Sequence, residues 1–341
     1  MIRVSEFDET VANQWDDYVV SSERATFFHL SAWRRVIESV FRHNAHYIYA
    51  EQDGQIIGVL PLVHVKSRIF GNALVSTPFC VYGGPVAEDS NTLESLVQHA
   101  TTLARRLSVD HLELRCRELL YDHWPNRELY VTFRKELSND PEENFHRIPR
   151  KQRAMIRKGA AEGLEAAVDE TTGRFFRMYS TSVRNLGTPT FSRRYFDALN
   201  NAFGEDCEIL TITRNGKAVS SVMSFYFRDE VLPYYGGGIA AARKWKANDF
   251  MYWELMRRAS EKGTKMFDFG RSKRDSGSYR FKKHWGFEPE SLYYQSYLVA
   301  AKSARDLSPA NPKYRVFIEA WKRLPLPLTR MLGPKVSRFL G

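Results

Sequence analysis

The chain has 341 residues, of which 43% are hydrophobic and 13% aromatic, and its formal net charge is +10. This length exceeds the usual size of one hydrophobic core, and the apolar content excludes an intrinsically disordered chain, so two globular domains are expected. The three cysteines, Cys80, Cys116 and Cys207, are far apart and odd in number. They offer neither a disulfide framework nor a zinc-binding spacing, and they favour a reducing compartment.

The positive charge is concentrated in two segments. Residues 301–341 carry a net charge of +7, and residues 147–158 contain six basic and no acidic side chains. Such segments favour specific contact with phosphates or with an anionic surface. The amino terminus is acidic and no run of about 18 apolar residues occurs, so we expect neither an export signal nor a membrane span, and a cytoplasmic location.

The first part of the chain predicts a β-hairpin followed by β, α and β elements. The hairpin turn is Asp53-Gly54, whose glycine accepts a positive φ. The periodicity and breaker residues predict the following elements in order: a helical region over 4–41 in which Ser31 caps the second helix, strands over 46–51, 55–66 and 72–86, a helix over 92–107 and a strand over 111–115.

The same order returns about 155 residues later. Three short motifs match: Asp-Gly at 53–54 with Asn-Gly at 215–216, Tyr-Gly-Gly at 82–84 with the same triplet at 235–237, and Leu-Glu-Leu at 112–114 with Phe-Asp-Phe at 267–269. An internal duplication explains them economically. The second copy predicts strands over 208–213, 217–227, 231–237 and 266–269, and a helix over 248–262. We therefore expect an α+β protein with a first domain over 1–140 and a second over 164–300.

A basic helix is expected to connect the two copies over 141–163. Asp140 is a good N-cap, Pro141 suits the first helical position, and acidic residues follow in the first turn. Arg153 and Arg157 lie in the part of this segment that lacks acids, which makes them candidates for phosphate contacts. The alternative is a solvated connector.

The tail, 301–341, combines prolines with apolar and basic residues, so short amphipathic pieces are expected. These pieces either pack on the body of the protein or lie on an anionic membrane leaflet.

The segment 265–289 has the strongest chemical character. A β-like run containing Asp268 stops at Gly270, a loop carries Arg271 and Lys273, and Ser276 is placed to cap a helix that presents cations among aromatic rings. The helix residues of interest are Tyr279, Phe281 and Lys282. A lysine held among rings is partly desolvated and can provide a fixed positive charge for a developing oxyanion or for a phosphate. The alternative is an amphipathic helix with a solvated basic face.

Two further residues have two readings each. Asp268 either orients and deprotonates an attacking amine or pairs with Arg271. Tyr235 precedes two glycines, which either let a ligand approach the backbone or mark a bulge or tight bend.

The repeated unit, the basic connector and above all the sequence FDFG…SGSYRFKKHWGFEP resemble the FemAB/FemX group, most nearly the FemAB-like proteins associated with exosortase/PEP-CTERM systems. The resemblance covers most of the chain and is stronger in 150–290 than in 1–140. It implies two tandem GNAT-like acyltransferase domains with mixed sheets flanked by helices. It also implies transfer of an aminoacyl group, typically from aminoacyl-tRNA, onto an amine of a cell-wall precursor.

The resemblance also suggests roles for individual residues. The family's Phe-Lys pair falls on Phe281-Lys282, where the lysine stabilises the transition-state oxyanion or the terminal phosphate of the tRNA donor. Arg193, Arg194 and Tyr195 lie in a segment similar to the one that binds the precursor's diphosphate. The first-domain contact, expected just after Trp33, falls on Arg34 or Arg35.

The leading hypothesis is therefore a cytoplasmic acyltransferase that forms an amide with an amine of a cell-envelope or exopolysaccharide precursor. No metal and no permanently bound cofactor are expected, since no cluster of His, Cys and Asp has ligand spacing. The first alternative is an acyl-CoA-dependent N-acetyltransferase, in which Arg243, Lys244 and Lys246 meet phosphates although residues 239–248 lack the usual glycines. The second is a non-catalytic adaptor that binds nucleic acid or the inner face of a membrane.

Overall fold

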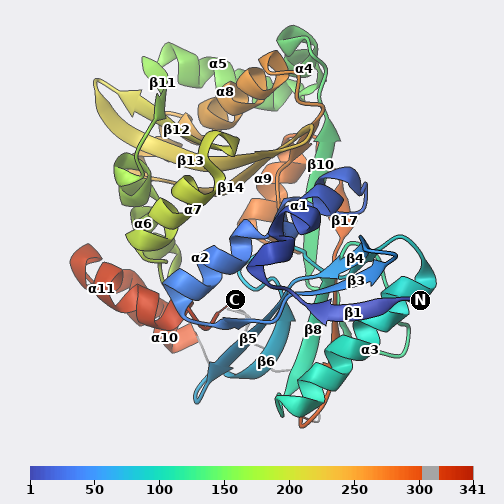
Figure 1. The fold of residues 1–341 in the computed structure, drawn as a ribbon. Helices are drawn as coiled ribbons and strands as arrows, with labels where there is room; N and C mark the ends of the chain where they lie inside the picture. The colour runs from blue at the N-terminus through green and yellow to red at the C-terminus, as the bar shows by residue number, and fades with distance from the viewer. Residues whose placement is uncertain (302–314, 341) are drawn as a thin grey trace. The chain divides into compact units, whose positions relative to one another are not determined.

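The computed structural model describes residues 1–301 and 315–340. The remaining part of the predicted tail, 302–314 with residue 341, lies outside this description. Contacts divide the chain into two units. The first contains Met1–Tyr130, the segment from Ser291 and the last residues from Arg338, and the second contains Val131–Glu290 and the segment that ends at Ser337 (Figure 1).

The first unit holds two mixed or antiparallel sheets. A four-stranded sheet has the order β1-β3-β4-β7, and a six-stranded sheet has the order β2-β5-β6-β8-β18-β9. The elements are β1 (Arg3–Glu6), α1 (Ala12–Ser21), α2 (Ala32–Phe41), β2 (Asn44–Ala45), β3 (Ile48–Gln52), β4 (Gln55–Leu60), β5 (Leu62–Ser67), β6 (Gly71–Ser76), β7 (Val86–Ala87), α3 (Ser90–Arg106), β8 (His111–Cys116), β9 (Asn126–Arg127) and β18 (Tyr293–Leu298), with short 3₁₀ turns at Glu9–Val11 and Phe27–His29.

The second unit is built on an eight-stranded sheet with the order β11-β12-β13-β14-β15-β10-β16, to which β17 adds by pairing with β10. Helices α5 and α8 cover one face of its β11–β14 part and α6 and α7 the other (Figure 1). The elements are β10 (Tyr130–Glu136), α4 (Pro141–Arg147), α5 (Arg150–Ala161), β11 (Leu164–Asp169), α6 (Gly173–Leu186), α7 (Arg193–Phe203), η3 (Gly204–Asp206), β12 (Cys207–Arg214), β13 (Lys217–Phe227), β14 (Glu230–Gly238), η4 (Ala240–Arg243), α8 (Ala247–Glu261), β15 (Met266–Asp268), β16 (Ser272–Lys273), α9 (Gly277–His284), β17 (Pro289–Ser291), α10 (Arg315–Arg323) and α11 (Leu326–Ser337).

Both units contain the same strand, crossover helix and parallel strand. In the first unit β6 pairs in parallel with β8 after α3, and in the second β14 pairs in parallel with β15 after α8. Both hairpin turns have left-handed backbone at both residues, since φ is 53° at Asp53, 81° at Gly54, 50° at Asn215 and 71° at Gly216. The predicted tandem arrangement of α+β domains is confirmed.

Each crossover is completed by an antiparallel strand from a distant part of the sequence. Strand β18 pairs with β8 in the first unit, and β10, which follows β8 in the chain, pairs with β15 in the second. The observed units therefore differ from the predicted boundaries at 140 and 164. Residues 131–140 lie in the second unit, as does the connecting segment, and the segment from Ser291 lies in the first.

Two of the predicted elements are each divided in two at a proline. The strand predicted over 55–66 is two strands, because Pro61 has no N–H to donate and the chain passes there from the four-stranded to the six-stranded sheet. The single connecting helix is also two helices, since Pro149 ends α4 and serves as the N-cap of α5. The Asp140 cap and Pro141 start of α4 are as expected.

Two further expectations are corrected. The region over 4–41 begins with strand β1, and Ser31 does not cap α2 with its side chain, because its hydroxyl donates instead to Asp16 at 2.7 Å. The two Tyr-Gly-Gly triplets are not equivalent either. Tyr82 lies in a loop between β6 and β7, whereas Tyr235 lies in strand β14.

Helices α10 and α11 of the tail pack on the second unit. Helices α10 and α11 contact α6, Trp321 is buried, and the Arg330 Nε donates to Ser180 Oγ at 3.0 Å. Arg184 donates to the Leu324 carbonyl at 3.3 Å. No helix in residues 1–301 or 315–340 is both long and apolar enough to cross a membrane.

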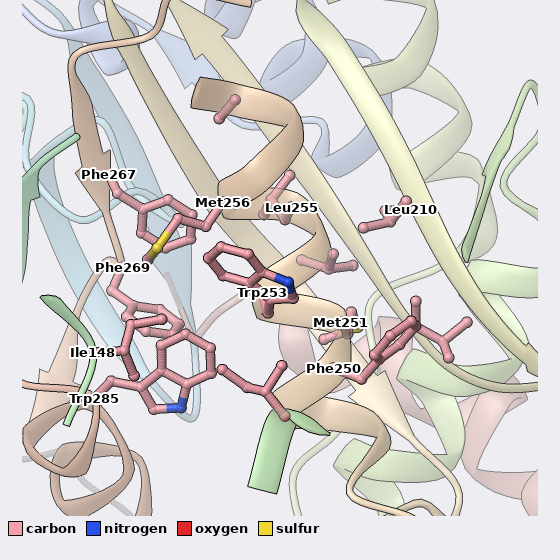
Figure 2. Close-up of a cluster of buried hydrophobic side chains, with 14 of the residues drawn as sticks. Ile148, Leu210, Phe250, Met251, Trp253, Leu255, Met256, Phe267, Phe269 and Trp285 are labelled. Atoms are coloured by element: carbon pink, nitrogen blue, oxygen red, sulfur yellow. The ribbon is translucent and has the colours of Figure 1, made fainter. Parts of the chain in front are cut away.

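The core beside the crossover of the second unit is made by α8 and the segment that follows β15. Figure 2 shows Trp253 and Met256 of α8 facing Phe267, Phe269 and Trp285. Because α8 buries residues around most of its circumference, its start is fixed firmly against the sheet.

Adjacent glycines in β14 give a matched test of this packing. A Cβ at Gly237 would lie 2.7 Å from the Ser182 Cβ and 2.9 Å from the Met178 carbonyl oxygen of α6. A Cβ at Gly236 would meet no atom nearer than the Tyr252 hydroxyl at 3.4 Å. We expect Gly237→Ala to lower the free energy of unfolding by about 1–3 kcal/mol through overpacking. Gly236→Ala should be neutral or slightly stabilising. Denaturant melts measure both, and equal effects would contradict the described α6–β14 contact.

Candidate functional site

Strands β14 and β15 separate soon after they meet. They are hydrogen-bonded in parallel only at Glu230 with Met266 and Val231 with Phe267, although β14 continues to Gly238. The later part of β14 therefore pairs with β13 alone. Helix α8 begins at Ala247, after β14 and η4. The Ser220 hydroxyl of β13, opposite Gly238 at the end of β14, donates to the Ala247 carbonyl at 3.4 Å.

A cleft of about 800 Å³ lies at the start of α8, within the second unit. The starts of α5 and α8, the turn η4, the end of α6 and one face of α9 form its walls. Its lining residues are Pro149, Lys151, Gln152, Met155, Leu186, Ala242, Arg243, Lys246, Asn248, Asp249, Gly277, Ser278, Phe281, Lys283 and His284.

The cleft is cationic. Lys151, Arg243, Lys246 and Lys283 line it, whereas Asp249 is the only carboxylate among its lining residues. The N-terminus of α8 adds partial positive charge, and its N-cap, Lys246, has φ 56° and provides no side-chain cap. These features suit an anionic ligand such as a phosphate group.

The backbone before α8 contributes little to such a ligand. The Ala242 N–H donates to the Ile239 carbonyl, and the Lys244 and Trp245 N–H groups donate to Ala241. These amides are used within the turn, so a phosphate in this cleft would depend mainly on lysine and arginine side chains.

Lys282 lies in the interior, although its chain neighbours Phe281 and Lys283 line the cleft. Its Nζ donates to the carbonyl oxygens of Gly270 at 2.7 Å and Arg271 at 3.2 Å. The rings of Phe133 and Phe269 lie 5.4 and 5.5 Å from it. Burial lowers the pKa of Lys282 to about 7, although Asp268 favours the charged form. The lysine is thus a buried amine that ties α9 to the loop after β15.

Asp268 is also buried, and it belongs to the interior rather than to the cleft lining. Its Oδ1 accepts from Thr132 Oγ1 at 3.0 Å and from the Gly270 N–H at 2.8 Å, and its Oδ2 lies 3.7 Å from Arg134 Nε. Arg134, which also pairs with Glu230, is therefore an ion-pair partner of Asp268. Asp268 and Lys282 lie in one buried group around Gly270.

The other residues of this segment divide between the surface and the interior. Arg271 is exposed, Lys273 is half-buried in β16, and Phe281 lines the cleft. Tyr279 packs edge-on against Phe133 with ring centroids 5.4 Å apart. Ser276 caps α9 as predicted by accepting from the Tyr279 N–H.

Tyr195 and Tyr235 are brought together away from the cleft lining. Both are buried, and their hydroxyl oxygens lie 2.9 Å apart in an aromatic cluster between α6, α7 and β14. The strand has a bulge beside Tyr235, and Gly237 contacts α6. The bulge lies at Tyr234, before the triplet, and the close approach of α6 accounts for Gly237.

The remaining basic candidates do not line the cleft. Arg193 and Arg194 are exposed at the start of α7, and the Arg193 Nε lies 3.7 Å from Asp197. Arg153 bonds to His146 at 3.1 Å, and Arg157 lies over the Phe145 ring, so both fasten α5 to α4.

The sequence analysis missed the cleft residues contributed by α5 and the start of α8, above all Gln152 and Asp249. The available signal was the Asn248-Asp249 pair in the first turn of a helix that follows a strand of the repeat. No group of three metal-ligating side chains occurs in the described ranges.

The fold is the tandem form of the GNAT acyltransferase fold. Residues 146–283, which include every cleft-lining residue except His284, match an acetyltransferase (GNAT) domain family. Comparison with curated proteins gave no match.

Solved structures share this fold at low sequence identity. The chain is similar to FemX (14% identity, TM-score 0.68, covering 93% of this chain and 100% of that one) and to a tandem GNAT protein from the clavulanic acid biosynthesis pathway (13%, 0.56, 89% and 100%). It is also similar to L-PGS from Bacillus licheniformis (13%, 0.52, 89% and 96%).

The buried lysine gives a pH-dependent prediction. Because the pKa of Lys282 falls from 10.5 in its ordinary state to about 7 in the folded chain, the unfolded chain binds more protons between these values and stability rises with pH across that window. From pH 7 to 9 the gain due to this residue is about 2 kcal/mol. Denaturant melts of the wild type and Lys282→Met should show that gain in the difference between the two proteins. A difference that does not change with pH would contradict the burial of the amine.

Proposed function

We propose that this protein is an N-acyltransferase that joins an activated acyl group to an amine, with the cleft at the start of α8 as its donor site. The observation that carries the proposal is the cationic lining of that cleft, inside the part of the chain that matches a GNAT domain. Acyl-CoA and aminoacyl-tRNA both carry phosphate groups, so the same cationic lining suits either donor.

The preferred donor is aminoacyl-tRNA, with an amine of a cell-envelope or exopolysaccharide precursor as acceptor. Support comes from the FDFG…SGSYRFKKHWGFEP sequence and from similarity to the FemX fold over nearly the whole chain. The backbone amides committed within the turn before α8 also favour a donor held by side chains. In this scheme Arg193 and Arg194, exposed on α7, contact the diphosphate of the precursor. Tyr195 is buried on the same helix and bonds to Tyr235.

The second candidate is an acyl-CoA donor, which the match to an acetyltransferase family favours. The two donors are distinguished by calorimetry with acetyl-CoA and with charged tRNA. Micromolar binding of acetyl-CoA would assign the thioester donor.

Lys282 is proposed to stabilise negative charge as the amide forms. Two of the three N–H groups of its ammonium donate to the Gly270 and Arg271 carbonyls, which hold the nitrogen beside the Phe133 and Phe269 rings. A positive charge fixed in a region of low dielectric stabilises an oxyanion without reorganisation.

This role predicts a large loss of turnover. Mass spectrometry of the protein incubated with each donor and candidate amines should detect an amide, and Lys282→Ala should lower kcat about 10²–10³-fold because a charge at the oxyanion is lost. Lys265→Ala, on an exposed lysine that pairs with Asp229, is the matched control and should retain full turnover. A loss of less than about threefold in a folded Lys282→Ala protein would remove the lysine from the mechanism.

We also propose a peripheral contact between the tail and an anionic membrane surface. Helix α10 exposes Val316 and Phe317, and residues 315–340 carry six basic side chains and one acidic side chain. Exposed apolar groups beside basic ones suit the interface of an anionic bilayer.

Vesicle sedimentation checks this contact. We expect the protein to sediment with vesicles that contain phosphatidylglycerol and not with pure phosphatidylcholine vesicles, and Val316→Asp with Phe317→Ser should weaken binding at least about tenfold. Ile69→Ser, at an equally exposed apolar residue of the first unit, should leave it unchanged. Equal sedimentation of both variants would argue against the tail as the contact.

A further inference from the structure

One carboxylate stands among the cations of the cleft. Asp249 lies in the first turn of α8 and is half-buried. The other ionisable residues of the cleft lining are all basic: Lys151 on α5, Arg243 on η4, Lys246 before α8, and Lys283 and His284 on α9. A cleft that binds only anions gains nothing from a carboxylate in its wall, since like charges repel.

Asp249 is not held by an ion pair. In the part of the chain that the structure describes, no lysine or arginine lies within 4.0 Å of its carboxylate. Its Oδ1 instead accepts a hydrogen bond from the amide of Gln152, a buried residue of α5. A neutral donor fixes the orientation of the carboxylate, and Lys246 acts on its charge without a direct ion pair.

The indole of Trp285 is a second polar group close to the Asp249 carboxylate. The indole nitrogen of Trp285 is buried and makes no hydrogen bond of normal geometry, yet it lies close enough to favour the charged form of Asp249. Burial outweighs the opposing effects of Trp285, Lys246 and Gln152 and raises the pKa of Asp249 above its ordinary value. A carboxylate with a raised pKa is a stronger base than an ordinary surface aspartate.

Asp268, the acceptor expected from the sequence, is less suited to this task. It is only 1% exposed, and its Oδ1 already accepts from Thr132 and from the Gly270 N–H. Asp249, in contrast, lines the open cleft.

We propose that Asp249 is the catalytic base of the cleft: its carboxylate binds the acceptor amine and takes the proton that the nitrogen loses as the amide forms. This inference rests on the proposed acyl transfer. The amine nitrogen forms a bond to the acyl carbon, and the bond from that carbon to the donor oxygen or sulfur breaks. The proton passes from nitrogen to Asp249 and then to the departing alkoxide or thiolate, so that charge and atoms balance. The ligand recognised by this carboxylate is a primary amine.

The test compares Asp249→Asn, Asp249→Glu and Glu254→Gln. Asparagine keeps an oxygen that accepts from Gln152 and removes the base, whereas Glu254 lies on the same helix and pairs with Arg257, which makes its variant the matched control. We expect Asp249→Asn to lower kcat at least about 100-fold, Asp249→Glu to restore part of it, and Glu254→Gln to retain it.

Two readouts separate a base from a structural residue. Calorimetry should show that Asp249→Asn binds the donor as tightly as the wild type or more tightly, because a negative charge has left a cationic cleft. The pH profile of kcat/KM should lose its acidic limb, which in the wild type rises as Asp249 deprotonates. Turnover within threefold of the wild type, or a profile that keeps its acidic limb, would overturn the proposal.

A measurement without catalysis keeps the inference separate from the proposed function. A ¹³C NMR titration should show the Asp249 carboxyl with a pKa above the ordinary value of about 3.9. A pKa at or below that value would overturn the inference whether or not a donor binds. If the wild type binds neither acetyl-CoA nor charged tRNA and forms no amide, while the titration shows the raised pKa, the proposed function has failed instead.

Discussion

The early separation of β14 from β15 determines where chemistry is possible in this protein. Two parallel pairs, Glu230 with Met266 and Val231 with Phe267, hold the strands together, and beyond them β14 has one partner strand only. The crossover helix α8 begins after β14 and η4, and its uncapped N-terminus, the turn before it and the start of α5 line the cleft. The cleft therefore lies where these helix ends meet, and its charge depends on which side chains they carry.

Lys282 connects this cleft to the interior. Its bonds to the Gly270 and Arg271 carbonyls fix α9 against the end of β15, and this leaves Phe281 and Lys283 facing the cleft. Burying an amine costs free energy because the charged form loses hydration, and the lowered pKa expresses that cost. The hydrogen bonds around Gly270 therefore hold α9 in place at the cleft wall. Lys282 makes these bonds and also carries the charge proposed for catalysis.

The repeated order of elements was predictable from the sequence because its signals are local. Asp53-Gly54 and Asn215-Gly216 specify tight turns, and the spacing of apolar residues specifies α3 and α8. The breaks at Pro61 and Pro149 have an equally local cause, the missing N–H, and were missed because the apolar pattern continues through both positions. The exchange of β10 and β18 between the units was not predictable, since it depends on pairing over more than 100 residues. The partial desolvation of Lys282 among rings was predicted from its neighbours in sequence, whereas the surroundings of Asp249 depend on α5, which places Gln152 against it.

Donor binding by calorimetry tests most directly whether the cationic cleft at the start of α8 is the donor site. Lys246→Ala removes a cation that lines the cleft, and Lys262→Ala removes one at the other end of α8 that pairs with Glu208. With whichever donor the wild type binds, acetyl-CoA or charged tRNA, Lys246→Ala should weaken binding about tenfold, the loss of one charge-assisted contact, and Lys262→Ala should leave it unchanged. Equal affinities for the wild type and Lys246→Ala would contradict the account.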